Sequence, residues 1–290
     1  MLITVFTPTY NRAHLLSRLY DSLCKQTYID FEWVIVDDGS SDKTDEVVLS
    51  FISNKLFSIN YIKQKNGGKH RAINRGVKEA KGELFFIVDS DDMLPVDALA
   101  NVSKTYEDIK DDNSFAGVCG LDGTLDGKII GCGLQKDIVD ENSLNIRVRN
   151  GVTGDMKEVF KTSVLKEFPF PEIKNEKFCP EMLLWNRIAT KYKLRYFNKV
   201  IYFAEYQSDG ITSGIVRARM NSPIASMMTY AEMTKYKNVP FLGKCKSAIN
   251  YWRFYLCSKQ HLIKPKIAMS WCLLFPIGFI MHLRDIRLTR

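Results

Sequence analysis

Histidine is scarce in this chain of 290 residues, and its cysteines are scattered. The four histidines show no HxxxH spacing, which argues against a histidine-rich metal site. The seven cysteines occur singly, without a CxxC pair, which argues against a disulfide framework or a zinc site and fits a reducing compartment. They are Cys24, Cys119, Cys132, Cys179, Cys245, Cys257 and Cys272.

The sequence also shows no internal repeat and no low-complexity linker. The opening MLITVFTPTYNR has neither a basic segment nor a cleavable apolar stretch, so we expect no signal peptide and a cytoplasmic protein. With 46% hydrophobic and 26% charged residues, the composition predicts a folded core and argues against extensive disorder.

The net charge is +8, but most of the chain has no excess of positive charge. From Met233 onward there are eleven Lys and Arg residues against one acid, Asp285, whereas the first 232 residues carry a net charge of −2. No nucleic-acid-binding motif accompanies the basic segment, so we expect no nucleic-acid partner. A basic and apolar tail favours anionic lipid headgroups instead.

The first 90 residues alternate between short apolar runs and segments with helical periodicity. This β-α-β-α-β-α-β series predicts an α/β fold with a doubly wound, mostly parallel sheet of the Rossmann-like kind. The expected strands are 3–8, 31–40, 59–64 and 83–89, and the expected helices are 13–26, 40–55 and 67–82.

The remainder of the chain is less regular. We expect a hairpin or an added strand over 115–133, a helix over 180–192 and β structure over 194–206. Two or three helices from about 217 to the end form a C-terminal helical extension. The predicted domains are 1–215, divided into a nucleotide-binding half (1–110) and an acceptor half (111–215), and the basic extension 216–290.

Polar clusters follow three of the expected strands: TPTYNR, DDGSSD and DSDD. Ligands of doubly wound sheets bind outside the carboxyl ends of the strands, so these clusters are expected to meet at one edge. The carboxylates of Asp89, Asp91 and Asp92 repel one another unless a hard divalent cation such as Mg²⁺ or Mn²⁺ lies among them. A solvated acidic turn is the alternative interpretation.

In this order and spacing, VFTPTYNR, VDDGSSD, NGGKHRAINRG and VDSDD resemble the inverting family-two glycosyltransferases with a GT-A fold. The resemblance is close over the first 110 residues and looser to about Ser213. It implies a UDP-sugar donor, a Mn²⁺ or Mg²⁺ cofactor, and a saccharide or lipid-linked acceptor of the cell-surface polysaccharide type.

The resemblance also implies roles for individual residues. Tyr10 stacks on the base beside Pro8 and Thr9, and Asp38 accepts the uracil N–H. Asp89 or Asp91 contacts the ribose and Asp92 binds the metal. The full nucleotide-binding set is Pro8, Thr9, Tyr10, Arg12, Asp38, Gly68, Lys69, Arg71, Asp89, Ser90 and Asp91, and the metal set is Asp91 and Asp92.

Lys69, His70 and Arg71 follow two glycines at the expected start of a helix. Helix N-termini and adjacent basic side chains suit phosphate groups, which favours a diphosphate contact here. A solvated basic turn is the alternative for each of the three residues.

Inversion requires a general base for the acceptor hydroxyl, and the resemblance points to Glu181 in CPEMLLWNR. The acidic pair usual in the family is reduced here to Glu-Met. Glu176 is the runner-up and Asp155 a more distant candidate. Glu181 alternatively serves only to complement a helix dipole, and Asp209 either helps to close the diphosphate site or lies in a plain Asp-Gly turn.

The tail is almost continuously apolar from Ile267 to Leu283. It is short for a membrane span and contains Pro276 and Gly278, so we expect 264–290 to lie in a membrane interface. A buried core helix is the alternative.

The leading hypothesis is a metal-dependent hexosyltransferase at the inner face of the cell membrane. The alternatives are a catalytically inactive sugar-nucleotide-binding module and a nucleotidyltransferase. The nucleotidyltransferase would need a Gly-rich loop after the first strand, where this chain has TPTYNR.

Overall fold

The computed structural model describes residues 2–147, 151–205, 214–258 and 264–289, which form two compact units. The sheet unit comprises Met1–Pro169 and Asn186–Gln207, and the helical unit comprises Phe170–Trp185 and Ser208–Arg290. Helix α7 (Glu181–Ala189) begins in the helical unit and ends in the sheet unit.

The sheet unit contains eight strands and the helices that cover them. Its strands are β1 (Ile3–Thr9), β2 (Phe31–Asp37), β3 (Ser58–Lys63), β4 (Leu84–Ile87), β5 (Phe115–Gly123), β6 (Ile138–Glu141), β7 (Met156–Lys161) and β8 (Lys193–Phe203). Its helices are α1 (Ala13–Cys24), α2 (Thr44–Ser53), α3 (Lys69–Glu79), α4 (Ala98–Glu107) and α6 (Thr162–Glu167).

The strand order is β3-β2-β1-β4-β7-β5-β8-β6. Strands β1 to β4 pair in parallel, β5 pairs in parallel with β8, and β7 runs antiparallel to both β4 and β5. The predicted doubly wound and mostly parallel sheet is confirmed. Because β2 and β4 flank β1, the chain reverses its direction of winding at β1, and the crevice at the carboxyl end of β1 is the usual ligand position.

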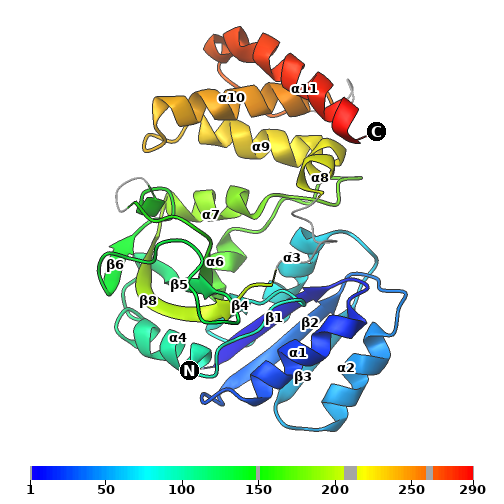
Figure 1. Cartoon of the computed structure of the whole chain (residues 1–290), viewed down its shortest axis with the longest axis vertical. Coiled ribbons are helices and arrows are strands. Elements are labelled where there is room, and N and C mark those ends of the chain that lie inside the picture. The colour runs from blue at the N-terminus through cyan, green and yellow to red at the C-terminus, as the bar shows by residue number, and fades with distance from the viewer. Residues whose placement is uncertain (1, 148–150, 206–213, 259–263, 290) are drawn as a thin grey trace. The chain divides into compact units, whose positions relative to one another are not determined.

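Helices cover both faces of the β1–β4 sheet. Helices α1, α2 and α4 share one buried cluster with Val5, Trp33 and Phe86, and Figure 1 shows α1 and α2 together on this face. On the opposite face α3 packs so closely that a Cβ at Gly76 would lie 2.2 Å from the Phe6 ring. Because helices cover both faces, residues that point to either side of β1, β2 and β4 are buried.

Several details differ from the sequence-based expectations. The strand expected over 115–133 is β5, which ends at Gly123; the turn at Leu125–Lys128 forms, and Ile129 contributes an isolated bridge to Gly123. Strand β6 was not predicted. Strand β7, inserted between β4 and β5, and helix α4 were not predicted. In α2 Val48 and Phe51 are buried and Val47 packs against the same core, whereas Ile52 is exposed.

The helical unit packs around a small aromatic core. It contains α8 (Ile215–Asn221), α9 (Pro223–Met233), α10 (Phe241–Tyr255), the 3-10 helix η1 (Met269–Leu274) and α11 (Phe275–Thr289). The rings of Tyr230 in α9 and Phe254 in α10 stack at 5.9 Å. Arg253 in α10 forms a buried ion pair with Asp285 in α11, so the last two helices are joined by packing and by charge.

The end of the helical unit exposes apolar side chains. The segment Met269–Leu288 is long and apolar enough to cross a bilayer by length and composition, and only 11% of it is buried. A buried core helix therefore does not describe this segment. Its exposed large hydrophobic residues are Met269, Leu273, Phe275, Ile277, Phe279, Ile280, Leu283 and Leu288.

Candidate active site

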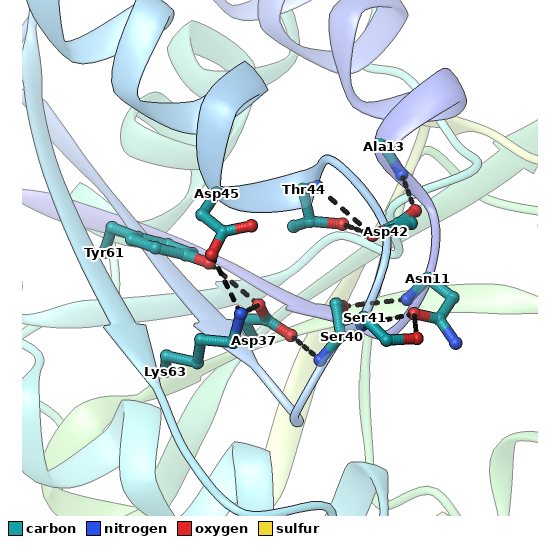
Figure 2. A network of polar contacts seen from close by, with 10 residues as sticks. All are labelled: Asn11, Ala13, Asp37, Ser40, Ser41, Asp42, Thr44, Asp45, Tyr61 and Lys63. Atoms are coloured by element: carbon teal, nitrogen blue, oxygen red, sulfur yellow. Dashed lines mark hydrogen bonds and ion pairs between the residues drawn. The ribbon is translucent and has the colours of Figure 1, made fainter.

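The loops that follow β1 and β2 are tied to each other by hydrogen bonds (Figure 2). Asn11 adopts a φ of 53°, a left-handed conformation that asparagine tolerates better than most residues. Its backbone N–H donates to Ser40 Oγ at 2.9 Å, and its Oδ1 accepts the backbone N–H of Ser41 at 2.8 Å. The Ala13 N–H, at the start of α1, donates to Asp42 Oδ2 at 3.1 Å, so the two loops form one framework.

The first aspartate of the VDD motif stabilises this framework. Asp37 is fully buried and accepts hydrogen bonds from the Ser40 N–H at 2.7 Å and from the Tyr61 hydroxyl at 2.8 Å. Burial and the Asp37 charge raise the pKa of Tyr61, so this hydroxyl stays protonated as a donor. Figure 2 shows Lys63 beside the same carboxylate, at 3.8 Å.

The second aspartate, Asp38, connects the β2 loop to the start of α3. Its Oδ1 accepts the Gln64 side-chain amide at 2.8 Å and the Gly67 N–H at 2.9 Å, and its Oδ2 accepts the Gly68 N–H at 2.7 Å. Gly68, one of the predicted nucleotide-binding residues, therefore donates its backbone N–H to Asp38. Among the described residues these bonds use both lone pairs of Oδ1 and one of Oδ2, which leaves one lone pair of Oδ2 for a ligand.

The β1 loop presents the residues predicted to hold the base. The Tyr10 side chain is 50% exposed, so one ring face is accessible for stacking. Pro8 is half-buried and Thr9 is buried. Within the described part of the chain, the Thr9 hydroxyl oxygen has no hydrogen-bond partner. Arg12 precedes α1 as its N-cap residue.

The start of α3 brings a positive charge to the DSDD segment. Lys69 Nζ lies 2.6 Å from Asp89 Oδ1 and 2.9 Å from Oδ2. Burial acts to raise the pKa of Asp89, but the charges of Lys69 and Lys157 outweigh it and hold that pKa below its usual range. Arg71 donates to the Gly67 carbonyl at 2.6 Å, and His70 is buried rather than directed to solvent.

The DSDD carboxylates differ sharply in their surroundings. Asp92 is buried; its Oδ1 accepts the Glu205 N–H at 2.8 Å and its Oδ2 accepts the Tyr202 hydroxyl. Burial and the Asp89 charge raise the pKa of Asp92 to about 6, against the hydrogen bond from Tyr202. The pKa of Asp91 is raised by the same two causes. Ser90, which lies between Asp89 and Asp91 in the chain, is also buried.

One further carboxylate at this edge was missed by the sequence analysis. Asp122 ends the apolar run FAGVCGLD of β5, which has the same form as FFIVDSDD and was the signal that could have revealed it. Its side chain is buried, and its Oδ1 has no hydrogen-bond partner among the described residues. Burial, with smaller contributions from Asp155 and Asp92, raises the pKa of Asp122 to about 6, although Lys157 acts to lower it.

The candidate general bases have distinct environments. Glu176 is buried, and its two oxygens accept the backbone N–H groups of Ile224 at 2.7 Å and Ala225 at 2.9 Å. This carboxylate therefore caps the first turn of α9. Glu181 is the first residue of α7 and is half-buried, and Asp155 is exposed before β7. Asp209 lies outside the described residues.

A divalent cation is compatible with the DSDD segment. In the described ranges no three His, Cys, Asp or Glu side chains are arranged to hold a metal by themselves. Mg²⁺ is commonly bound by only one or two carboxylates together with substrate phosphates and water. Asp91 and Asp92 offer such a partial set, and burial, with a smaller contribution from the Asp89 charge, raises both pKa values.

Comparisons with known proteins agree with this arrangement. The family described as glycosyl transferase family 2 matches residues 4–120. The chain is 31% identical over 223 residues to a Campylobacter jejuni protein named GalNAc(5)-diNAcBac-PP-undecaprenol beta-1,3-glucosyltransferase, covering 73% of this chain and 67% of that protein. It is 26% identical over 179 residues to the Staphylococcus aureus poly(ribitol-phosphate) beta-N-acetylglucosaminyltransferase TarS, covering 59% of this chain and 30% of TarS.

Solved structures share the fold. A crystal structure of S. aureus TarS in complex with UDP-GlcNAc has a TM-score of 0.62 at 18% identity, covering 98% of this chain and 81% of that chain. A mannosyltransferase from Pyrobaculum calidifontis in complex with GDP-Man and Mn²⁺ has a TM-score of 0.57 at 18% identity, covering 96% and 73%. Both are similar to this chain over almost its whole length.

Proposed function

Because the chain is a glycosyltransferase that belongs to glycosyl transferase family 2, we propose that it moves a hexose from a UDP-sugar, with inversion, to a saccharide or lipid-linked glycan acceptor in cell-surface polysaccharide synthesis. The observation that carries the proposal is the meeting of the polar segments after β1, β2 and β4 at the switch point of the sheet. The undecaprenol-linked substrate in the name of the C. jejuni relative supports the acceptor class.

In this proposal the nucleotide lies against the β1 and β2 loops. The exposed ring of Tyr10 stacks on the base. The remaining lone pair of Asp38 Oδ2 accepts the imide N–H of uracil, whereas the ring nitrogen of cytosine carries no such proton. Arg12, Lys69 and Arg71 supply positive charge along the path from the β1 loop to α3.

The diphosphate belongs beside the DSDD segment. Asp92 and Asp91 are the residues that would hold Mn²⁺ or Mg²⁺, and Asp89 or Asp91 would contact the ribose. A cation bound there would neutralise the charge that develops on the departing UDP. Lys69 keeps Asp89 ionised, so this carboxylate is ready to accept hydroxyl hydrogen bonds at neutral pH.

Glu181 is our proposed general base, and Glu176 is assigned a structural role. Glu181→Gln should retain UDP-sugar affinity and lose transfer by about two or more orders of magnitude, because proton removal from the acceptor fails. Glu176→Gln should retain transfer while lowering stability by about 1 kcal/mol, because one oxygen of its α9 cap is lost. Reversed results in a matched transfer and denaturation series would exchange the two roles.

The proposed function is tested by calorimetric titration of UDP, GDP and CMP, each with and without Mn²⁺. We expect UDP to bind in a Mn²⁺-dependent way and the other two nucleotides to bind more weakly. Asp92→Asn should lose the Mn²⁺ dependence, whereas Asp126→Asn, an exposed turn residue, should match the wild type. Failure of the wild type to bind UDP would refute the donor class, and UDP-sugar binding without any transfer would favour an inactive binding module.

We also propose that residues 264–290 contact the surface of the membrane that carries a lipid-linked acceptor. The exposed apolar side chains of η1 and α11 are accompanied by Lys264, Lys266, Arg284 and Arg287, which suit anionic headgroups. On this proposal the enzyme works at the inner face of the cell membrane. Sedimentation with anionic vesicles should be strong for the wild type and weak for Leu273→Asp, and equal sedimentation would refute the contact.

A further inference from the structure

Asp122 has no role in the function proposed above, yet its side chain lies at the same edge of the sheet as the DSDD segment. Asp122 of β5 is the register partner of Tyr202 in the parallel strand β8. The register of β5 and β8 shifts between Leu121 and Asp122, so this pair alone does not fix the face of Asp122. The regular pairing of Gly120, two residues earlier, with Lys157 of β7 places Asp122 on the face of Lys157. Lys157 lies over the ring of Tyr202, whose hydroxyl contacts Asp92 and the Asp89 N–H, so Asp122 faces the same side as the DSDD segment.

Lys157 of β7 lies on this face too. It is the register partner of Gly120, two residues before Asp122 on β5, and strand side chains alternate with a period of two. Its Nζ lies 3.7 Å from the centre of the Tyr202 ring. Asp122 and Lys157 therefore border one region, at the carboxyl end of β5 and beside the DSDD segment.

The protein leaves Asp122 incompletely satisfied. Its side chain is 5% exposed, and within the described residues its Oδ1 has no hydrogen-bond partner. Buried carboxylate oxygens are normally paired, and each exception calls for an explanation, of which a ligand hydroxyl is one.

We propose that Asp122 recognises the transferred sugar by accepting a hydrogen bond from one of its hydroxyl groups. A carboxylate repels phosphate and needs a neutral donor, and the hydroxyls of the hexose are the neutral donors of a UDP-sugar nearest the diphosphate. Lys157 supplies the neighbouring positive charge that keeps the carboxylate ionised. This inference rests on the proposed function, and it makes Asp122 a residue that determines which sugar is accepted.

The test separates the sugar from the nucleotide. Calorimetry in Mn²⁺ measures the affinity of the full chain for UDP and for UDP-glucose, UDP-galactose, UDP-GlcNAc and UDP-GalNAc. Asp122→Ala should weaken binding of the preferred UDP-sugar by about tenfold to a hundredfold, the value of a hydrogen bond to a charged group. The affinity for UDP itself should change by less than about twofold. Asp122→Asn keeps the side-chain volume and one carbonyl acceptor, so its loss should be smaller.

Each outcome decides between roles. An equal loss for UDP and UDP-sugar overturns the proposal, because Asp122 then acts on the nucleotide, the metal or the fold. Unchanged affinities in both variants overturn it as well. Loss restricted to UDP-sugar in Asp122→Ala, with the smaller loss in Asp122→Asn, supports it. A wild-type chain that binds no UDP refutes the proposed function itself, which is a different result from UDP binding with no effect of Asp122.

Discussion

Neutralising Asp122 should make the protein more stable, although it should also damage sugar recognition. The pKa of Asp122 rises from an ordinary 3.8 to about 6 on folding, because the charged form is buried. The folded state therefore binds this proton more tightly than the unfolded state, and wild-type stability falls as the pH rises through the window from 3.8 to 6. Asparagine carries no charge at any pH and escapes this penalty.

The size of the effect follows from the shift in pKa. A change of about two pKa units corresponds to ~3 kcal/mol of unfolding free energy at pH 7.5, and about half of that remains at pH 5. Imperfect pairing of the new amide group reduces the gain. We therefore expect Asp122→Asn to be about 1–3 kcal/mol more stable than the wild type at pH 7.5, with a smaller difference at pH 5.

Urea denaturation followed by circular dichroism, in EDTA at both pH values, measures this difference as a shift of the midpoint. Asp42→Asn is the matched control of opposite sign. Burial acts to raise the pKa of Asp42, but hydrogen bonds from Thr44 and from the Ala13 N–H lower it overall, so the Asp42 charge stabilises the folded state above its unfolded pKa. The reasoning is refuted if the stability gain of Asp122→Asn over the wild type is no larger at pH 7.5 than at pH 5.

Two further substitutions test the packing of each unit. Gly76→Ala should destabilise the sheet unit by about 1–3 kcal/mol in thermal melts, because the new Cβ meets the Phe6 ring. This loss outweighs the better helix propensity of alanine. Gly214→Ala, which has open space around it, should be nearly neutral in the same melts. Asp285→Ala should destabilise the helical unit by about 1–3 kcal/mol, because the half-buried Arg253 loses its ion-pair partner and keeps its hydrogen bond to Asn250. Limited proteolysis should then cleave α11 faster than in the wild type, and unchanged cleavage would contradict that role.

The first half of the sheet was predictable because its elements are local. Each strand from β1 to β4 is a short apolar run followed by a helix with its own periodicity, and the loops fall at strand ends by topology alone. The placement of β7 was not predictable in this way. It pairs with β4 across more than 70 residues and separates β4 from β5, and no local pattern encodes such a pairing.

The same distinction applies to the site. The sequence motifs identified Tyr10, Asp38 and the DSDD aspartates, but hydrogen bonding decides what each oxygen has left for a ligand. Asp38 was assigned from the sequence to the base alone, and the structure adds its bonds to the two glycines before α3. Asp122 was overlooked because its burial depends on β8, which enters the sheet about 80 residues later.

The framework of the β1 and β2 loops has a consequence for the thermodynamics of ligand binding. Asn11 is fixed by Ser40 and Ser41, and the start of α1 is fixed by Asp42, before any ligand arrives. A pocket that is already ordered loses little conformational entropy when it is occupied. On the proposed function, the nucleotide end of the donor should bind to a preorganised surface, with a heat-capacity change set by the area of the base that it buries rather than by folding of the loops.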